Sequence, residues 1–176
     1  MPKASQPPRP PAAKIHVSGA GVVRLPTLIL IDRGDGGHLI VEPPRPVWER
    51  SELSARELAA WSRLVAATGA AMLECLPQLR DGCVNYWEAG NWQLNDAAEP
   101  PGPKPVRDHR RVHLHVFGRS RDARHPAWLW GEAPAFPRFA DRETWARDFR
   151  PLTSSECASI AAAITRHWRR LEGTEP

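Results

Sequence analysis

Cysteine is scarce in this sequence, and the few cysteines form no recognisable motif. Cys75, Cys83 and Cys157 are not closely spaced and include no C-x-x-C pair. An odd number of cysteines without close spacing argues against a disulfide framework and against a structural zinc site. We therefore expect reduced thiols, as is typical of a cytoplasmic protein.

Long hydrophobic runs are lacking too. The chain has 176 residues, of which 41% are hydrophobic and 25% charged. No apolar stretch approaches the length of a membrane span, so we expect no membrane partner. The opening stretch MPKASQPPRPPAAK has no apolar segment, which argues against a secretory signal, and its proline content predicts a flexible tail over residues 1–13.

Lysine is rare, and the positive charge of the chain comes mostly from arginine. The formal net charge is +4, from 24 basic and 20 acidic residues. Arginine carries a planar fork of donors that matches phosphate and carboxylate groups. A mild basic excess is compatible with a nucleotide partner, but solvated surface arginines also account for it. We expect no stable complex with nucleic acid.

Short apolar runs bounded by glycine and proline predict strands. The first two are expected at residues 27–32 and 38–43, and the RGDGG between them suits a turn because glycine adopts positive φ easily. RGDGG lacks the spacing of a phosphate-binding loop. A third strand is expected over residues 82–91, followed by a long, proline-rich loop.

Two capping boxes mark the starts of two helices. Ser54 and Glu57 form the first, in a helix that Pro77 ends, and Thr153 and Glu156 form the second. Strands before and after a helix, without a βαβ rhythm, predict an α+β fold with an antiparallel sheet. The expected buried stripe of the first helix consists of Leu58, Trp61, Val65, Met72 and Leu76.

The stretch RRVHLHVFGR, residues 110–119, predicts a strand with two histidines on one face. Side chains alternate between the faces of a strand, so Arg111, His113 and His115 share one face. The two histidines are expected about 7 Å apart along the strand. This face is expected to be cationic and to titrate near neutral pH. The opposite, apolar face would consist of Val112, Leu114 and Val116.

Three interpretations of this strand compete. It is either a half-exposed strand with polar residues toward water, a metal site, or a site of nucleophilic catalysis. A metal site, as in a zinc-dependent hydrolase, needs a third ligand, which His38, His109 or Cys83 would have to supply. In the catalytic interpretation, a neutral imidazole attacks phosphorus and carries the phosphoryl group covalently, while arginines stabilise its charge.

The order of these parts resembles the histidine triad (HIT) family of nucleotide hydrolases and transferases. The resemblance covers residues 28–119: an apolar strand ending in Asp32, then GGHLIVEPPRPV, a helix, VNYWEAGN and RVHLHVFGR. The family motif is His-φ-His-φ-His-φ-φ, with φ apolar, and this chain matches it from the second histidine onward. The matching residues are His113, Leu114, His115, Val116 and Phe117.

The resemblance implies a HIT-like domain over residues 14–120, with a sheet of about five strands and one long helix. Residues 121–176 would form a helical extension packed on the same domain. Family members commonly form homodimers. They hydrolyse nucleotide conjugates, such as diadenosine tetraphosphate or nucleoside phosphoramidates, through a nucleotidyl-histidine intermediate. No cofactor is required, although a divalent cation accompanies some polyphosphate substrates.

The resemblance also implies roles for single residues. His113 would be the nucleophile, and His115 would hold phosphate oxygens. Asp32 would bind the ribose hydroxyls, and Glu88 or Asn91 would lie near the nucleotide.

The chain departs from the family motif at its first histidine, which is Arg111 here. We expect Arg111, Arg107 and Arg45 to act as fixed cations on the phosphates and Arg119 to bind phosphate as well, with His109 partly replacing the absent histidine. His38 is interpreted as structural. The alternative is a catalytically degenerate protein that binds nucleotides without cleaving them.

Overall fold

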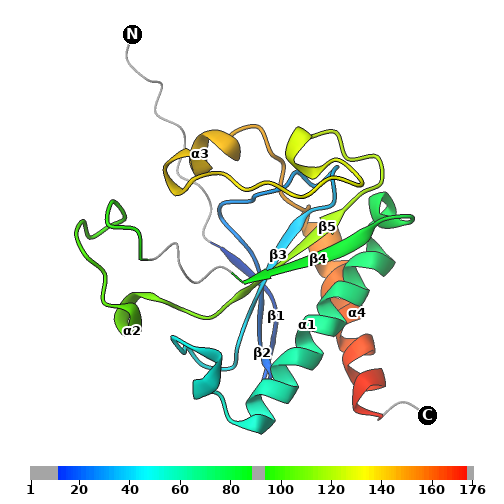
Figure 1. The fold of residues 1–176 in the computed structure, drawn as a ribbon. Coiled ribbons are helices and arrows are strands. Elements are labelled where there is room, and N and C mark those ends of the chain that lie inside the picture. The colour runs from blue at the N-terminus through cyan, green and yellow to red at the C-terminus, as the bar shows by residue number, and fades with distance from the viewer. Residues whose placement is uncertain (1–11, 89–93, 174–176) are drawn as a thin grey trace.

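An antiparallel sheet forms the centre of the molecule (Figure 1). The structure is a computed structural model and describes residues 12–88 and 94–173. Its five strands run in the order β1-β2-β3-β5-β4, and every neighbouring pair is antiparallel. The α+β class and the sheet of five strands are therefore confirmed. The strands are β1 (Ala13–Ser18), β2 (Gly21–Leu25), β3 (His38–Glu42), β4 (Cys83–Glu88) and β5 (Leu114–Arg119).

The two long helices begin at the capping boxes that the sequence predicts. In α1 (Ala55–Cys75), Ser54 accepts from the backbone of Glu57, whose carboxylate accepts from the backbone of Ser54. Thr153 and Glu156 make the same reciprocal pair at the start of α4 (Ser154–Glu172). Two shorter helices are α2 (Val106–His109) and α3 (Arg142–Trp145). No helix in the described ranges is both long and apolar enough to cross a bilayer.

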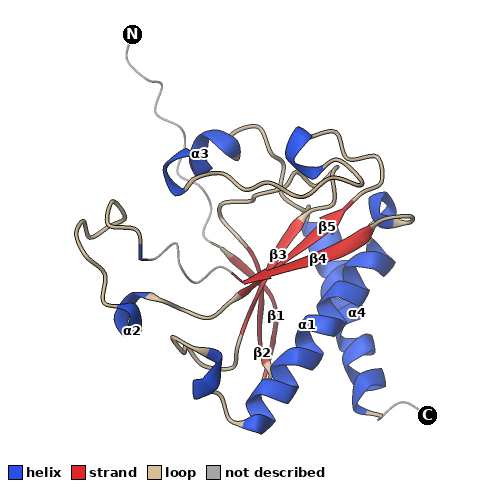
Figure 2. Ribbon diagram, viewed as in Figure 1, coloured by secondary structure: helices blue, strands red, loops and turns tan. Residues whose placement is uncertain are grey.

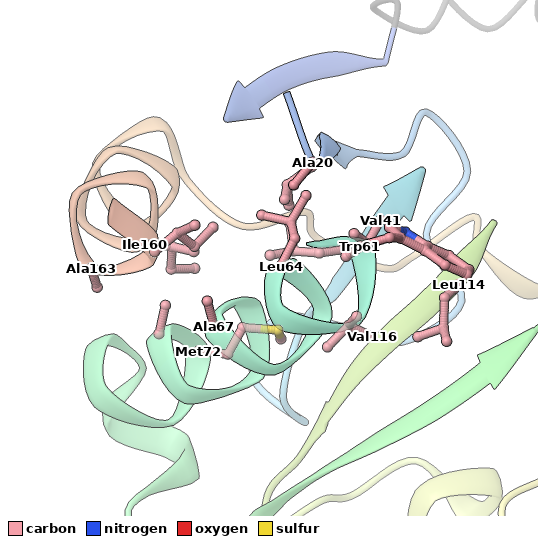
Figure 3. Packing of buried hydrophobic residues seen from close by; sticks show 14 of the residues in the cluster. Ala20, Val41, Trp61, Leu64, Ala67, Met72, Leu114, Val116, Ile160 and Ala163 are labelled. Atoms are coloured by element: carbon pink, nitrogen blue, oxygen red, sulfur yellow. The ribbon is translucent and has the colours of Figure 1, made fainter. Parts of the chain in front are cut away.

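Helices α1 and α4 lie side by side and cover one face of the sheet (Figure 1). Figure 3 shows the main hydrophobic cluster, in which Trp61 and Met72 of α1 and Ile160 of α4 pack with strand residues. The predicted apolar face of the histidine strand is part of it. Leu58, expected in the buried stripe of α1, is 36% exposed and lies outside this cluster. The strand residues are Val23, Leu39, Val41, Leu114 and Val116, with Val112 just before β5.

The opposite face of the sheet is covered in part by residues 27–32 and 120–149, which are mostly loop (Figure 2). A second hydrophobic cluster forms there around Phe117 of β5 and Trp128, both fully buried. The indole Nε1 atoms of Trp128 and Trp145 both donate to the carbonyl of Leu30. The face that carries His115 is thus partly covered.

The expected strand at residues 27–32 is wrong, and two strands were not anticipated. Residues 27–32 are irregular, and only Ile29, Leu30 and Ile31 among them are buried. The backbone N–H and carbonyl of Leu30 are satisfied by side chains instead of a neighbouring strand. β1 and β2 form a hairpin from Ala13 to Leu25, so the sheet begins inside the expected tail. The third expected strand is found as β4 over Cys83–Glu88, and residues 89–91 of the expected range lie outside the described residues.

β5 begins later than predicted. Arg111, Val112 and His113 precede it, so only His115 of the two histidines lies within the strand. His109, expected to replace the absent triad histidine in part, does not lie on β5 but ends the short helix α2.

Candidate functional site

Three imidazole rings are hydrogen-bonded in series on the sheet face opposite α1. Nε2 of His38, the first residue of β3, lies 2.8 Å from Nδ1 of His115. Nε2 of His115 lies 3.1 Å from Nε2 of His113. This series places three histidines together, of which the HIT motif in the sequence supplies two.

The two ends of the series fix the tautomer of every ring. The backbone N–H of Leu30 donates to Nδ1 of His38 at 3.2 Å, so Nε2 of His38 must carry the proton. That proton is donated to Nδ1 of His115, whose own proton is then on Nε2 and faces Nε2 of His113. Nδ1 of His113 donates to the carbonyl of Arg111 at 2.8 Å. Neutral rings satisfy all of these bonds at once, and the lone pair of His113 is on Nε2.

Burial keeps the inner two rings neutral. His38 is 1% exposed and His115 is 8% exposed. Desolvation, and to a smaller extent the positive charge of a protonated His113, lowers the pKa of His115 to about 3. Desolvation also places the pKa of His38 well below its usual value. The expectation that this face titrates near neutral pH is therefore wrong for His115.

Aromatic contacts hold the His115 ring in place. It is stacked on Phe117 with ring centroids 5.5 Å apart and on His38 at 5.0 Å. Trp87 of β4 lies 5.4 Å away on the neighbouring strand. Side chains on β3, β4 and β5 therefore fix the ring, so the nitrogen that faces His113 has a defined position.

His113 borders a cavity of about 590 Å³ on the same face of the sheet. This volume is typical of a small-molecule site. Its floor consists of side chains from β2 and β3, and its walls are the proline-rich segment after β3 and the segment before β5. The lining residues are Val22, Arg24, Ile40, Glu42, Pro43, Pro44, Arg45, Pro46, Arg111, Val112 and His113.

Arg111 is the cation nearest to His113 in sequence, and it lines this cavity. Its Nη1 donates to the carbonyls of Arg110 and Arg107 at 2.7 and 3.1 Å, and within the described ranges it forms no ion pair. Its charge is therefore available to an anion in the cavity. Arg45, in contrast, is paired with Glu57 at 2.9 Å. Arg107 lies over the ring of Trp48, with its guanidinium carbon 4.8 Å from the ring centroid.

An ion-pair network fixes the segment that carries Arg111 and His113. Arg110 contacts Glu49 at 2.7 Å and Glu88 at 3.6 Å, and Glu88 also contacts Arg50 at 2.6 Å. The backbone N–H of Val112 donates to the carbonyl of Val47. Glu88, expected to contact nucleotide, thus connects β4 to the segment before β5. Asn91, the other candidate from this part of the sequence, lies outside the described residues.

Two further candidates lie toward the far end of β5. Arg119 is 8% exposed and donates to the backbone carbonyls of Trp128, Leu129 and Glu132. Asp32 lies near Gly37, its carboxylate accepting from the backbone and guanidinium of Arg150. The structure does not bring Asp32 and Arg119 together with His113, and their nucleotide roles stay predictions.

Metal ligands do not converge here. Within residues 12–88 and 94–173, no group of three or more His, Cys, Asp or Glu side chains is placed to hold a metal ion. The three histidines direct their nitrogens at one another. The zinc interpretation of the His-x-His spacing therefore has no support from the geometry of these residues.

Sequence reasoning missed the participation of His38. Its signal is the alternation in HLIVE: Leu39 and Val41 face the helices, so His38 must face the other way. Placing it beside His115 also requires knowing that β3 and β5 are neighbours. The register pairs His38 with Phe117 and Ile40 with His115.

Comparison with solved structures identifies the fold. A crystal structure of a histidine triad (HIT) protein from Sinorhizobium meliloti matches 89% of this chain and 90% of its own, with a TM-score of 0.53 and 20% sequence identity. A Hit-like protein involved in cell-cycle regulation from Bartonella henselae covers 89% and 87%, with a TM-score of 0.47 and 11% identity. No protein-family model and no curated protein matches the sequence. The HIT-like fold implied by the resemblance is confirmed.

Proposed function

We propose that this chain, whose fold is HIT-like, hydrolyses nucleotide conjugates through a nucleotidyl intermediate on His113. The observation that carries the proposal is the series of three hydrogen-bonded imidazoles that ends at His113, beside a cavity of about 590 Å³. A nucleophilic imidazole needs a neutral ring, a fixed tautomer and access to substrate. The series supplies the tautomer, and the cavity supplies the access.

In the first step, Nε2 of His113 attacks the α-phosphorus of the conjugate. A bond from Nε2 to phosphorus forms, the bond from phosphorus to the leaving group breaks, and the leaving group departs with the electron pair. A polyphosphate leaves as the anion, whereas an amine takes up a proton from the solvent as it departs. The imidazole then carries a positive charge. The carbonyl of Arg111, which accepts the Nδ1 proton of His113, stabilises this charge.

His115 has a second role in this step. Its Nε2 proton faces the lone pair of His113 that has to attack. When a phosphate oxygen enters the cavity, the same proton can be donated to that oxygen, which frees the lone pair of His113. Because the His115 ring is fixed by stacking, this exchange of acceptor needs little movement.

In the second step, water attacks phosphorus and restores the enzyme. The bond from phosphorus to Nε2 breaks with its electron pair returning to His113, and water gives up a proton to the solvent as the mononucleotide forms. Arg111 lines the cavity, and in this scheme its guanidinium contacts the non-bridging oxygens. Dinucleoside polyphosphates and nucleoside phosphoramidates both fit this scheme, and a divalent cation can accompany a polyphosphate.

The test compares wild type with His113→Ala on fluorogenic nucleoside phosphoramidates and dinucleoside tetraphosphates. We expect turnover to fall by a factor of about 10³ or more, because the nucleophile is removed. Brief incubation of wild type should also give a peptide containing His113 whose mass is increased by one nucleotidyl group. Arg138→Gln, at an arginine that is 87% exposed, is the matched control and should stay active. Full activity of His113→Ala contradicts the mechanism.

The second candidate function is nucleotide binding without turnover. One observation favours it: the guanidinium in the first triad position donates to backbone carbonyls instead of contacting the histidine series. This function predicts that nucleoside monophosphates bind while no conjugate is cleaved.

Metal analysis of the purified protein tests the zinc interpretation, and size-exclusion chromatography tests the expected homodimer.

A further inference from the structure

The cavity beside His113 contains an ion pair whose hydrogen-bonding groups are only partly used. Nε of Arg24 on β2 donates to Oε2 of Glu42 on β3 at 2.7 Å. The two side chains are 24% and 37% exposed, so solvent or a ligand reaches them. This is the sole bond that either side chain makes to a described residue. Both Nη groups of Arg24 and Oε1 of Glu42 remain available.

The strand register places this pair at a defined distance from the histidines. Arg24 pairs with Ile40 across β2 and β3, and Ile40 pairs with His115 across β3 and β5. Neighbouring strands lie about 4.8 Å apart, so the backbone of Arg24 is about 10 Å from that of His115. A nucleoside 5′-monophosphate bridges such a distance, with its phosphate at the histidines and the edge of its base at the ion pair.

The floor between the two ends is apolar. Val22 and Ile40 are half-exposed, and neither belongs to one of the two hydrophobic clusters. Pro43, Pro44 and Pro46 form the wall beside them. A planar aromatic base can cover these apolar surfaces, which suit neither a sugar nor a phosphate.

We propose that this cavity selects guanine, and that Arg24 and Glu42 are the residues that read the base; the proposal rests on the proposed function. Guanine presents two adjacent acceptors, O6 and N7, which match the two Nη groups of an arginine. Next to O6 lies the N1–H donor, and Oε1 of Glu42 is the acceptor available beside Arg24. The ion pair thus offers two donors and an acceptor in the order that guanine needs.

Adenine fits the same groups less well. It carries an amino donor where guanine has O6, so one Nη group of Arg24 would face another donor. Its N1 is an acceptor, which Oε1 of Glu42 would repel. The ion pair of Arg24 and Glu42 brings no net charge to this end of the cavity, while Arg111 and the histidines attract phosphate to the other. The charge distribution therefore orients the nucleotide with its base over β2.

The test measures the dissociation constants of GMP, IMP and AMP by titration calorimetry with wild type and with Arg24→Gln/Glu42→Gln. The double variant removes both charges together and leaves no unpaired ion. For wild type we expect GMP and IMP to bind about tenfold or more tightly than AMP, because they share O6, N7 and N1–H. In the double variant this preference should disappear. Arg138→Gln/Asp141→Asn, which removes an exposed pair outside the cavity, should leave it unchanged.

Several outcomes overturn the proposal. Equal affinities of wild type for GMP and AMP would overturn it. A preference for GMP that persists in the double variant, with thermal unfolding unchanged, would also overturn it. If guanosine and adenosine phosphoramidates are cleaved equally well, base selection fails but the proposed hydrolysis stands. If no nucleotide binds and no conjugate is cleaved, both fail. A double variant that does not fold leaves the wild-type affinities to decide.

Discussion

Nε2 of His38 lies 2.8 Å from Nδ1 of His115, and this bond joins two rings that are almost fully buried. It forms only when Nδ1 of His115 is unprotonated and free to accept. A proton on that nitrogen would break the bond and leave a charge in an apolar environment. The hydrogen bond between His38 and His115, and with it the geometry of the site, therefore depends on pH.

We predict that the protein loses stability as pH falls from 6.5 toward 3. The pKa of His115 is about 3 in the folded chain against 6.5 for an ordinary histidine, and that of His38 is lowered in the same direction. In this window the unfolded chain binds protons that the folded chain does not, so acid favours unfolding. Each such histidine contributes a slope of about 1.4 kcal/mol per pH unit. Urea unfolding at a series of pH values measures it.

His115→Gln should reduce the pH dependence of the free energy of unfolding by the contribution of one histidine, about 1.4 kcal/mol per pH unit. Glu156→Gln serves as the control. Partial burial raises the pKa of Glu156, but bonds from Arg33 and Thr153 outweigh it and place the pKa below 4.5. That variant should change the pH dependence only below about pH 4.5. A free energy of unfolding that stays constant between pH 6.5 and 5 would contradict the buried, neutral assignment.

The second prediction concerns His38 itself. His38→Leu removes the partner of the Leu30 N–H and the donor to His115, two buried groups. We expect a loss of about 2–5 kcal/mol in the free energy of unfolding, and lower turnover because His115 no longer has a fixed tautomer. His38→Gln, which keeps an amide donor, should lose less of both. Nitrogen NMR of the imidazoles would report the tautomers directly, and a stable, fully active His38→Leu would refute the role.

Sequence reasoning succeeded where the signal is local. The capping boxes at Ser54 and Thr153 require only residues three apart, and both helices begin there. The burial of Leu114 and Val116 follows from alternation within one strand. The strand predicted at residues 27–32 is absent. An apolar run does not reveal that Trp128 and Trp145, about a hundred positions away, donate to the carbonyl of Leu30.

The candidate site, too, could be predicted only where the signal in the sequence is local. His113 and His115 stand out because they are two residues apart, and the structure places their nitrogens 3.1 Å from each other. The cavity and the Arg24–Glu42 pair depend on which strands are neighbours, so no short stretch of sequence indicates them. Asp32 ends an apolar run as expected, but its partner Arg150 comes from the C-terminal part of the chain.

The third prediction distinguishes a structural role for Asp32 from ribose binding. Partial burial raises the pKa of Asp32, but hydrogen bonds from Arg150 and Gly34 outweigh it and hold the pKa below its usual value. Asp32→Asn should cost about 1–2 kcal/mol of stability, increase proteolysis near Arg150 and leave nucleotide affinity unchanged. Arg150→Ala should cost less, since its side chain is 68% exposed and its backbone N–H still donates.

Ribose binding by Asp32 makes the opposite prediction. Asp32→Asn would then weaken binding of GMP and AMP but not of their 2′,3′-dideoxy forms, which lack the hydroxyls. Calorimetry on the four ligands separates the two roles. A loss of affinity confined to the ribonucleotides would show that the hydrogen bonds from Arg150 to the Asp32 carboxylate break when substrate binds.

The fourth prediction tests whether the side chain of Arg111 acts as the phosphate cation. Its carbonyl accepts the Nδ1 proton of His113, and this bond to the backbone does not depend on the side chain at position 111. Arg111→Ala should therefore keep the fold and the tautomer of His113 but lower kcat/KM about tenfold, with a weaker dependence on ionic strength. Arg111→His, which restores the first triad histidine, should preserve or raise turnover. If Arg111→Ala matches wild type at both low and high salt, the guanidinium has no part in holding the phosphates, and the histidines and backbone must hold them alone.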